Sequence, residues 1–566
     1  MPEYLSPGVY VEELDRGSKS IEAAGTAMPV FVGFSEKAER TRTIDGEPIT
    51  ENLLNRAQLV TSWTQYRESF GNMIEGAYMP HSVYGYFLNG GSRCYVMSVK
   101  TIPRAETALP NAQDKPQLIA RARRAGLDGL RLRVRVDVKP SLTAPAAKPA
   151  GSKKAAAKKG SDGEADADTP APASGGGAPA ESFTITVERQ GQNSSWISKE
   201  SFRNLKLAET QRADGTTMVE VVYPNSARPQ LIELVVPDTV TALAQAWPRQ
   251  NEGEVLKIQN QLVPPATYAD FQGDVTKRAG VDGLADLDDA TMLVIPDIMS
   301  TMPGQKRDQA FMDNVKAVQS LMIAHCEQMG DRVAILDAPP DMTPQEVNNW
   351  RMDTAGYDTS YAALYYPWIE IMDPVTNRPI KIPPSGHMAG VWARTDNTRG
   401  VHKAPANEVV QGAIGVGYKV AKGEQDVLNP NQVNCIRVFP GEGIKVWGAR
   451  TLSGSNPSWK YINVRRFFNM VEKSIEDSTS WTVFEPNDER LWAQIRRDVS
   501  AFLSIQWRNG ALFGATPDQA YFVKCDAELN PKEIRDAGQV IIEVGMAPVT
   551  PAEFVIFRVF QWSPEQ

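Results

Sequence analysis

The sequence predicts a multidomain protein of the α/β and α+β classes, in which a mostly parallel α/β sheet forms the central domain. Three observations support this fold class. The chain has 566 residues, which is too long for a single hydrophobic core. Short apolar runs alternate with a helical pattern after about residue 281, as in a parallel sheet. The last third contains two long amphipathic helices and further strands, which indicates a separate C-terminal core of two helices and β-strands.

Composition excludes several classes of protein. Apolar residues make up 42% and charged residues 23%, as in an ordinary soluble domain. A net charge of −8 argues against a general nucleic-acid binder, which needs a basic surface. The longest uncharged apolar stretch, residues 361–369, is about half of what a membrane-spanning helix requires. The first residues do not resemble a signal peptide. We therefore expect assembly in the cytoplasm without direct membrane insertion.

A β-rich insertion domain is expected over residues 101–280. Residues 130–138 alternate Leu or Val with charged side chains, which predicts a half-buried strand, and residues 183–187 and 217–223 look like further strands. Between them, residues 140–182 contain almost no large apolar side chain, so we expect a disordered spacer in a surface loop. A polyelectrolyte binding tail is the less favoured interpretation of its lysine cluster.

The central domain is predicted from a strand–helix–strand pattern. Residues 291–296 and 332–337 are short apolar runs typical of strands buried on both faces, and residues 309–328 carry apolar side chains at helical spacing. Thr343 and Glu346 form a capping-box pattern at the start of another helix. Residues 361–371 look like a third strand. The pattern is a βαβ unit of a mostly parallel sheet.

Two wide apolar stripes predict the C-terminal helices. They run over residues 464–478 and 491–507, with Asn487 as the expected N-cap and Gly510 as the expected stop of the second helix. Stripes of this width are ordinary core.

Catalytic motifs are almost absent. The four cysteines occur singly, and none of the common nucleotide, zinc or serine-hydrolase motifs is present. Asp297 and Asp337 follow two predicted strands, where open α/β sheets bind ligands, and His387 opens a helix. We favour structural roles for all three residues. An α/β enzyme, such as a hydrolase built around them, remains the alternative from another class.

Both ends of the chain carry short apolar segments. Residues 7–12 are separated from the next strand, Pro29–Phe34, by a polar stretch, and residues 554–560 are apolar on nearly both faces. An unpaired apolar strand is an aggregation hazard. These segments therefore pair either within the subunit or with a neighbouring copy by strand addition.

The sequence resembles the contractile tail sheath proteins of phages and related bacterial injection systems. The resemblance is carried by four groups of residues: 4–13 (YLSPGVYVEE); 383–390 (PPSGHMAG), continued by 393–396 (ARTD) and 400–407 (GVHKAPAN); 462–466 (INVRR) with 484–488 (FEPND); and 551–557 (PAEFVIF). The stretch from about 101 to 275 carries none of these motifs, which fits an outer decorating domain that varies in this family.

The resemblance implies a domain order and a function. The domains would be an exchanged N-terminal arm (1–25), an N-terminal part of the sheath core (26–100), the outer insertion (101–280), the α/β sheath domain (281–445) and a C-terminal inner domain with an exchanged strand (446–566). The implied protein is a non-enzymatic subunit that forms stacked hexameric rings around an inner tube and contracts from a metastable extended state. The alternative is a non-contractile sheath-like component of the tail or baseplate.

The same resemblance implies contact residues and partners. The residues implied in strand exchange between subunits are Val9, Tyr10, Val11, Val555, Ile556, Phe557 and Val559. Lys532 and Arg535, on a short helical turn, are the candidates that face the tube. The implied partners are further copies of the chain, the inner tube protein, and baseplate and terminal cap proteins. No cofactor, metal or nucleic acid is expected.

Overall fold

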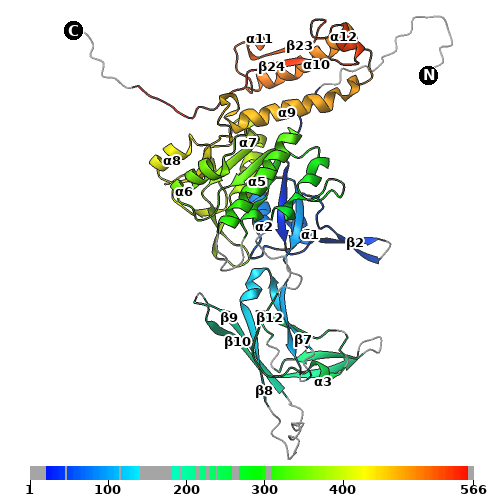
Figure 1. Ribbon diagram of the computed structural model, residues 1–566, viewed down its shortest axis with the longest axis vertical. Coiled ribbons are helices and arrows are strands. Elements are labelled where there is room, and N and C mark those ends of the chain that lie inside the picture. Colours follow the sequence, from blue (N-terminus) through cyan, green and yellow to red (C-terminus); the bar gives the residue numbers. More distant parts are fainter. Residues whose placement is uncertain are drawn as a thin grey trace, which may run out of the picture. The chain divides into compact units, whose positions relative to one another are not determined.

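The computed structural model describes residues 21–558 apart from 45–46, 103, 112, 114–115, 140–181, 192, 212–216, 225–227, 238, 241, 258–266 and 301–307. The chain divides into two compact units. The first combines residues up to Thr101 with those from Leu262 onward, and the second runs from Ile102 to Gln261 (Figure 1). Residues 267–280, which the sequence pattern grouped with the insertion, belong to the first unit, where Phe271 stacks on Phe34.

A mixed nine-stranded sheet forms the centre of the first unit. The six strands in its middle are parallel, and antiparallel strands close both sides. The expected α/β class with a mostly parallel sheet is therefore confirmed. In spatial order the strands are β19 (Glu408–Val409), β22 (Gly443–Trp447), β21 (Val433–Phe439), β16 (Ala362–Tyr366), β15 (Val333–Asp337), β14 (Met292–Val294), β1 (Pro29–Ser35), β5 (Cys94–Thr101) and β4 (Gln58–Val60).

The predicted strand–helix–strand unit is present in this sheet. Helix α5 (Gln309–Met329) connects the parallel strands β14 and β15, and α6 (Pro344–Asn349) begins at the predicted capping box of Thr343 and Glu346. The other helices of this part are α1 (Trp63–Phe70), α2 (Met79–Leu88), α4 (Tyr268–Gln272), α7 (Ser385–Arg399) and α8 (Lys422–Leu428). A small hairpin, β2 (Glu39–Ile44) and β3 (Glu47–Asn52), precedes α1.

The single strand expected over residues 361–371 is wrong. The chain forms β16 and then β17 (Ile369–Met372), which belongs to a different sheet with β18 (Pro379–Ile382) and β20 (Ala413–Val416). Pro367 lies between the two strands and has no N–H to continue the ladder of β16.

The predicted helix pair forms the C-terminal core. Helices α9 (Ile462–Thr479) and α10 (Glu489–Arg508) share a buried cluster with α11 (Pro517–Ala520) and with the hairpin of β23 (Tyr521–Lys524) and β24 (Glu543–Met546) (Figure 1). The N-cap of α10 is Asp488 rather than Asn487, because the Asp488 carboxylate accepts from the N–H groups of Arg490 and Leu491. Gly510 has a positive φ of 79°, as expected for a helix stop.

The second unit is β-rich. Its five-stranded sheet has the order β11 (Thr217–Val222), β10 (Trp196–Gln211), β9 (Ser182–Gln190), β8 (Leu132–Lys139) and β13 (Asn251–Val255), and a three-stranded sheet joins β12 (Ile232–Val235), β7 (Pro116–Ala125) and β6 (Arg104–Pro110). The predicted alternation is present in β8, where Val134 and Val136 are fully buried and Arg133 pairs with Glu188. The spacer expected over 140–182 lies outside the described residues except for Ser182, which begins β9.

Candidate assembly surfaces

The motif at 383–390 serves close packing between helices. A Cβ at Gly386 would lie 2.4 Å from the Cα of Ser82, and a Cβ at Gly390 would lie 2.7 Å from the carbonyl oxygen of Tyr86. Both contacts are with α2. On α2 itself, a Cβ at Gly85 would lie 2.2 Å from the ring of His387. The glycines of this motif therefore bring α7 against α2, and the motif is structural.

The two candidate catalytic acids bind main-chain and hydroxyl groups at the ends of their strands. Asp297 accepts from the N–H groups of Phe34 (2.6 Å) and Met79 (3.2 Å), among others. Asp337 accepts from the N–H (2.8 Å) and hydroxyl (2.5 Å) of Ser385, at the start of α7. Burial raises the pKa of Asp297 to about 6 and that of Asp337 to about 7. Their oxygens are thus occupied in joining segments of the fold.

His387 is also placed for packing. It lies in the first turn of α7, as expected, and it is only 1% exposed. Burial lowers its pKa to about 3, and the neighbouring His81 acts in the same direction. Its Nδ1 has no hydrogen-bond partner within the described part of the chain. A histidine held neutral beneath the α2–α7 contact offers little to general base chemistry.

In the part of the chain that the structure describes, no three His, Cys, Asp or Glu side chains are grouped so that they could hold a metal ion. Among the same residues, no helix is long and apolar enough to cross a membrane.

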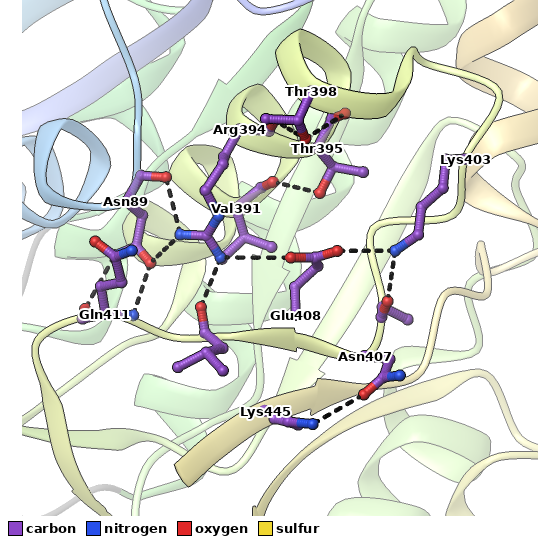
Figure 2. A network of polar contacts seen from close by, with 12 residues as sticks. Asn89, Val391, Arg394, Thr395, Thr398, Lys403, Asn407, Glu408, Gln411 and Lys445 are labelled. Carbon is purple, nitrogen blue, oxygen red and sulfur yellow. Dashed lines mark hydrogen bonds and ion pairs between the residues drawn. The ribbon is translucent and has the colours of Figure 1, made fainter. Parts of the chain in front are cut away.

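The motifs at 393–396 and 400–407 meet in one polar network (Figure 2). Arg394 donates to the carbonyl oxygens of Asn89 (3.1 Å) and Val409 (2.6 Å) and lies 3.8 Å from the carboxylate of Glu408. Lys403 approaches the same carboxylate to 3.0 Å. The network fixes the segment between α7 and β19 to the end of α2, so these motif residues also hold the subunit together.

The stem of the N-terminal arm is attached to α9. Arg466 donates to the carbonyl oxygen of Thr26 (2.8 Å), and the N–H of Ala24 donates to the hydroxyl of Ser474 (2.9 Å). Ile21 is buried among the apolar residues of α9 and α10. Residues 21–26 therefore lie against the C-terminal core. The candidate exchange residues Val9, Tyr10 and Val11 lie outside the described residues.

The other candidate exchange segment is exposed. Phe554, Val555, Ile556 and Phe557 are 72%, 69%, 78% and 85% exposed, and residues 551–558 form no strand with the rest of the described chain. Four consecutive apolar side chains in water are costly for a folded subunit. Val559 lies outside the described residues.

The hairpin of β23 and β24 offers open strand edges. Among the described residues, no third strand pairs with either of its two strands. One face of the hairpin packs on α10, where Tyr521 donates to the carbonyl oxygen of Ser500 (3.1 Å). Helix α12 (Lys532–Asp536) lies in the connection between the two strands, and the tube-facing candidates Lys532 and Arg535 are exposed on it.

Two buried ion pairs were not predicted from the sequence. Arg466 pairs with Asp396, and Arg450 pairs with Glu553, at 2.5 Å in both cases. Each pair joins residues that are distant in the chain, so no spacing rule connects them. The only local signal was a charged residue within an apolar motif, as for Glu553 between Ala552 and Phe554.

Comparison with protein families and known proteins agrees with this architecture. A family model described as the phage tail sheath protein central domain matches residues 298–452, and one described as the phage tail sheath C-terminal domain matches residues 454–561. The tail sheath protein of Vibrio phage KVP40 is 24% identical over 207 residues, which cover 36% of this chain and 30% of that protein. The tail sheath protein of Salmonella phage ViI is 25% identical over 250 residues, covering 40% and 38%. The chain thus aligns with only about a third of the length of these two relatives.

The fold is also found in solved structures. The PVC sheath complex of an extracellular contractile injection system, in its contracted state, has a TM-score of 0.54 and 23% identity, with 99% of both chains covered. The helical sheath of the anti-feeding prophage in its contracted state has a TM-score of 0.54 and 22% identity over 99% of both chains. At this identity the match shows a shared fold. The expected resemblance is thereby confirmed, because residues 298–452 and 454–561 match the models of the phage tail sheath central and C-terminal domains.

Proposed function

We propose that this chain is the structural subunit of a contractile sheath. Its copies form stacked hexameric rings around an inner tube, and the sheath contracts from a metastable extended state to drive the tube through a target envelope. The observation that carries the proposal is the exposed segment 554–557, whose apolar side chains have no partner within the described part of their own subunit. A sequence that exposes such a segment needs another chain to cover it.

A second copy is the partner that fits this segment. An extended segment joins an open sheet edge through main-chain hydrogen bonds, and β23 and β24 present such edges. Because the donated segment and the accepting edge are different parts of the subunit, the contact is heterologous. A heterologous contact that does not close generates a helical assembly. The N-terminal arm, with Val9, Tyr10 and Val11, would make a second contact of this type from its attachment at α9.

The proposed mechanism requires no bound nucleotide. The extended sheath is kinetically trapped, and a trigger at the baseplate lets the subunits slide into a better-packed lattice. If each subunit gains about 2–3 kcal/mol, as in other conformational equilibria, about a hundred subunits deliver hundreds of kcal/mol. The chain would act mechanically rather than as an enzyme. Its partners would be the tube, the baseplate and a terminal cap, within a phage tail or tail-like particle that is assembled in the cytoplasm.

The tube-facing surface is proposed to be α12. It must release the tube during contraction, and exposed charges suit a contact of this kind because surface ion pairs contribute little, about 0–1 kcal/mol each. Lys532 and Arg535 are exposed there and would meet acidic groups of the tube protein.

Electron microscopy of the chain co-expressed with its tube protein tests the function. Full-length protein should form striated helical cylinders, and a variant that lacks residues 1–14 should form none. Cylinders in both samples would keep the sheath assignment but contradict donation of the N-terminal arm. Dispersed subunits in both samples would contradict the proposed function. Cylinders that cannot be brought to a shorter, wider form would favour the alternative, a non-contractile sheath-like component.

A further inference from the structure

The C-terminal segment changes abruptly from attached to free at Glu553. Before it, the N–H of Val549 donates to the carbonyl oxygen of Ala511 (3.2 Å), and the carbonyl oxygen of Val549 accepts from Asn463 (3.1 Å). After it, the four side chains of residues 554–557 are each at least 69% exposed. Glu553 is therefore the last residue before the exposed segment whose side chain is held by the body of the subunit.

The Glu553 carboxylate forms a bidentate contact with Arg450. Arg450 donates from Nε to Oε1 (2.8 Å) and from Nη2 to Oε2 (2.5 Å), and Lys460 Nζ lies 3.5 Å from Oε2. The two paired side chains are only 8% and 15% exposed. A bidentate arginine–carboxylate pair fixes orientation as well as distance, which a single lysine contact does not.

Arg450 is itself held rigidly. Its Nη1 donates to the carbonyl oxygen of Asn429 (2.9 Å). Its main chain exchanges two hydrogen bonds with the side chain of Asn434 in β21, at 2.7 and 2.8 Å, and Asn434 is fully buried. These hydrogen bonds join Arg450 to the central sheet, so Glu553 is attached to that sheet through Arg450.

Charge stabilises the contact despite its burial. Burial acts to raise the pKa of Glu553, but the hydrogen bonds and charge of Arg450, followed by the charge of Lys460, bring it below its ordinary value. The carboxylate is therefore ionised across the neutral range.

We propose that Arg450 and Glu553 form a clamp that fixes where the C-terminal segment leaves the subunit, and so positions Phe554–Phe557 for pairing with a second copy. Both are positioning residues. An extended chain advances about 3.3 Å per residue, so the four apolar residues reach only about 13 Å from the clamp. Because the segment is so short, a displacement of the residue at which it leaves the subunit shifts the pairing register of the whole strand by one residue or more. This inference rests on the proposed strand exchange.

Motion of the segment tests the clamp directly. The four native cysteines are buried, so a spin label can be placed on a single new cysteine, Phe554→Cys or Phe557→Cys, in the unassembled subunit. Glu553→Gln should sharpen the spectrum of the label at 554, next to the clamp, and leave the label at 557 nearly unchanged. Lys473→Gln, which breaks the pair with Asp477 on α9, is the matched control and should change neither spectrum.

Assembly tests the positioning role in chains that lack the label. Glu553→Gln should reduce the yield of cylinders at least tenfold while the thermal unfolding of the free subunit stays close to that of the unchanged chain. The exchanged pair Arg450→Glu with Glu553→Arg should restore part of that yield. Arg450→Lys keeps the charge but loses the bidentate contact, so it should assemble at an intermediate level. If the other variants do not fold, this milder variant tests the clamp in their place.

The outcomes separate the clamp from the proposed function. An unchanged spectrum at 554, or full assembly by Glu553→Gln and Arg450→Lys, would overturn the clamp while the sheath assignment stands. Absence of cylinders from the unchanged chain would instead contradict the proposed function.

Discussion

The guanidinium of Arg466 on α9 lies 2.5 Å from the carboxylate of Asp396 on α7, and the two side chains are only 4% and 3% exposed. The same guanidinium lies 4.7 Å from the centre of the Trp392 ring and donates to the carbonyl oxygen of Thr26. One arginine thus joins the central domain, the C-terminal core and the stem of the N-terminal arm.

Removal of either member of this pair should strongly destabilise the subunit. Arg466→Met leaves the Asp396 carboxylate buried without its partner, and we expect the free energy of unfolding to fall by about 3–5 kcal/mol. Urea unfolding of the free subunit measures the change. The double variant Arg466→Met with Asp396→Leu should lose less than the sum of the single losses. Additive losses would show that the pair is not coupled. Lys473→Met, which removes a partly exposed pair with Asp477, should cost less than about 1 kcal/mol.

The glycine contact between α2 and α7 should not tolerate a methyl group. Gly386→Ala would place a Cβ 2.4 Å from the Cα of Ser82, which is main chain and cannot move aside. We expect a loss of about 1–3 kcal/mol in the free energy of unfolding. Gly423→Ala on α8 is the matched control, because its Cβ would meet no atom within 4 Å. It should leave stability unchanged or raise it by up to about 1 kcal/mol. Equal effects in the two variants would contradict the packing argument.

Asp337 should make stability depend on pH. Its pKa is raised by burial from 3.8 to about 7. Between these values the folded state keeps a proton that the unfolded chain has lost. The contribution of Asp337 is therefore complete below pH about 4 and declines as the pH rises to about 7. Asp337→Asn cannot titrate and keeps an oxygen that can accept from Ser385.

Urea unfolding at several pH values checks this sign. The free energy of unfolding of the unchanged chain, minus that of Asp337→Asn, should fall as the pH rises through this window. A difference that stays constant or rises would show that the carboxylate is ionised in the folded subunit throughout.

Charge reversal on α12 should separate sheath from tube. Lys532→Glu together with Arg535→Glu should weaken the retention of tube inside isolated cylinders, while contacts within the rings persist. The measurement is the ratio of tube to sheath protein after the cylinders are sedimented. Lys419→Glu with Lys422→Glu makes the same charge change at two other exposed positions and should leave the ratio unchanged. If the charge reversal on α12 leaves the ratio unchanged, the tube contacts a different surface of the subunit.

Local patterns predicted several elements of the first unit. The buried strands β14 and β15, the helix between them, and the cap at Thr343 follow from periodicity and side-chain chemistry that act over a few residues. The predicted strand over 361–371 was wrong because its apolar run continues across Pro367, whose missing N–H ends one sheet before the next begins.

Long-range pairing was beyond a single sequence. Nothing in the spacing connects Asp396 with Arg466 or Arg450 with Glu553, because folding alone brings these residues together. Asn487 was mistaken for the N-cap of α10 since Asn and Asp cap helices equally well. In the structure Asp488 is the N-cap of α10. The side-chain oxygen of Asn487 instead accepts from the indole N–H of Trp492 (2.8 Å).

A cryo-EM map of the assembled cylinder, at a resolution that shows side chains, tests the central claim most directly. The account predicts that Val555, Ile556 and Phe557 of each copy lie as a strand against the hairpin of β23 and β24 in a different copy. Density that instead returns this segment to its own subunit, or that leaves both hairpin edges open, would contradict assembly by exchanged strands.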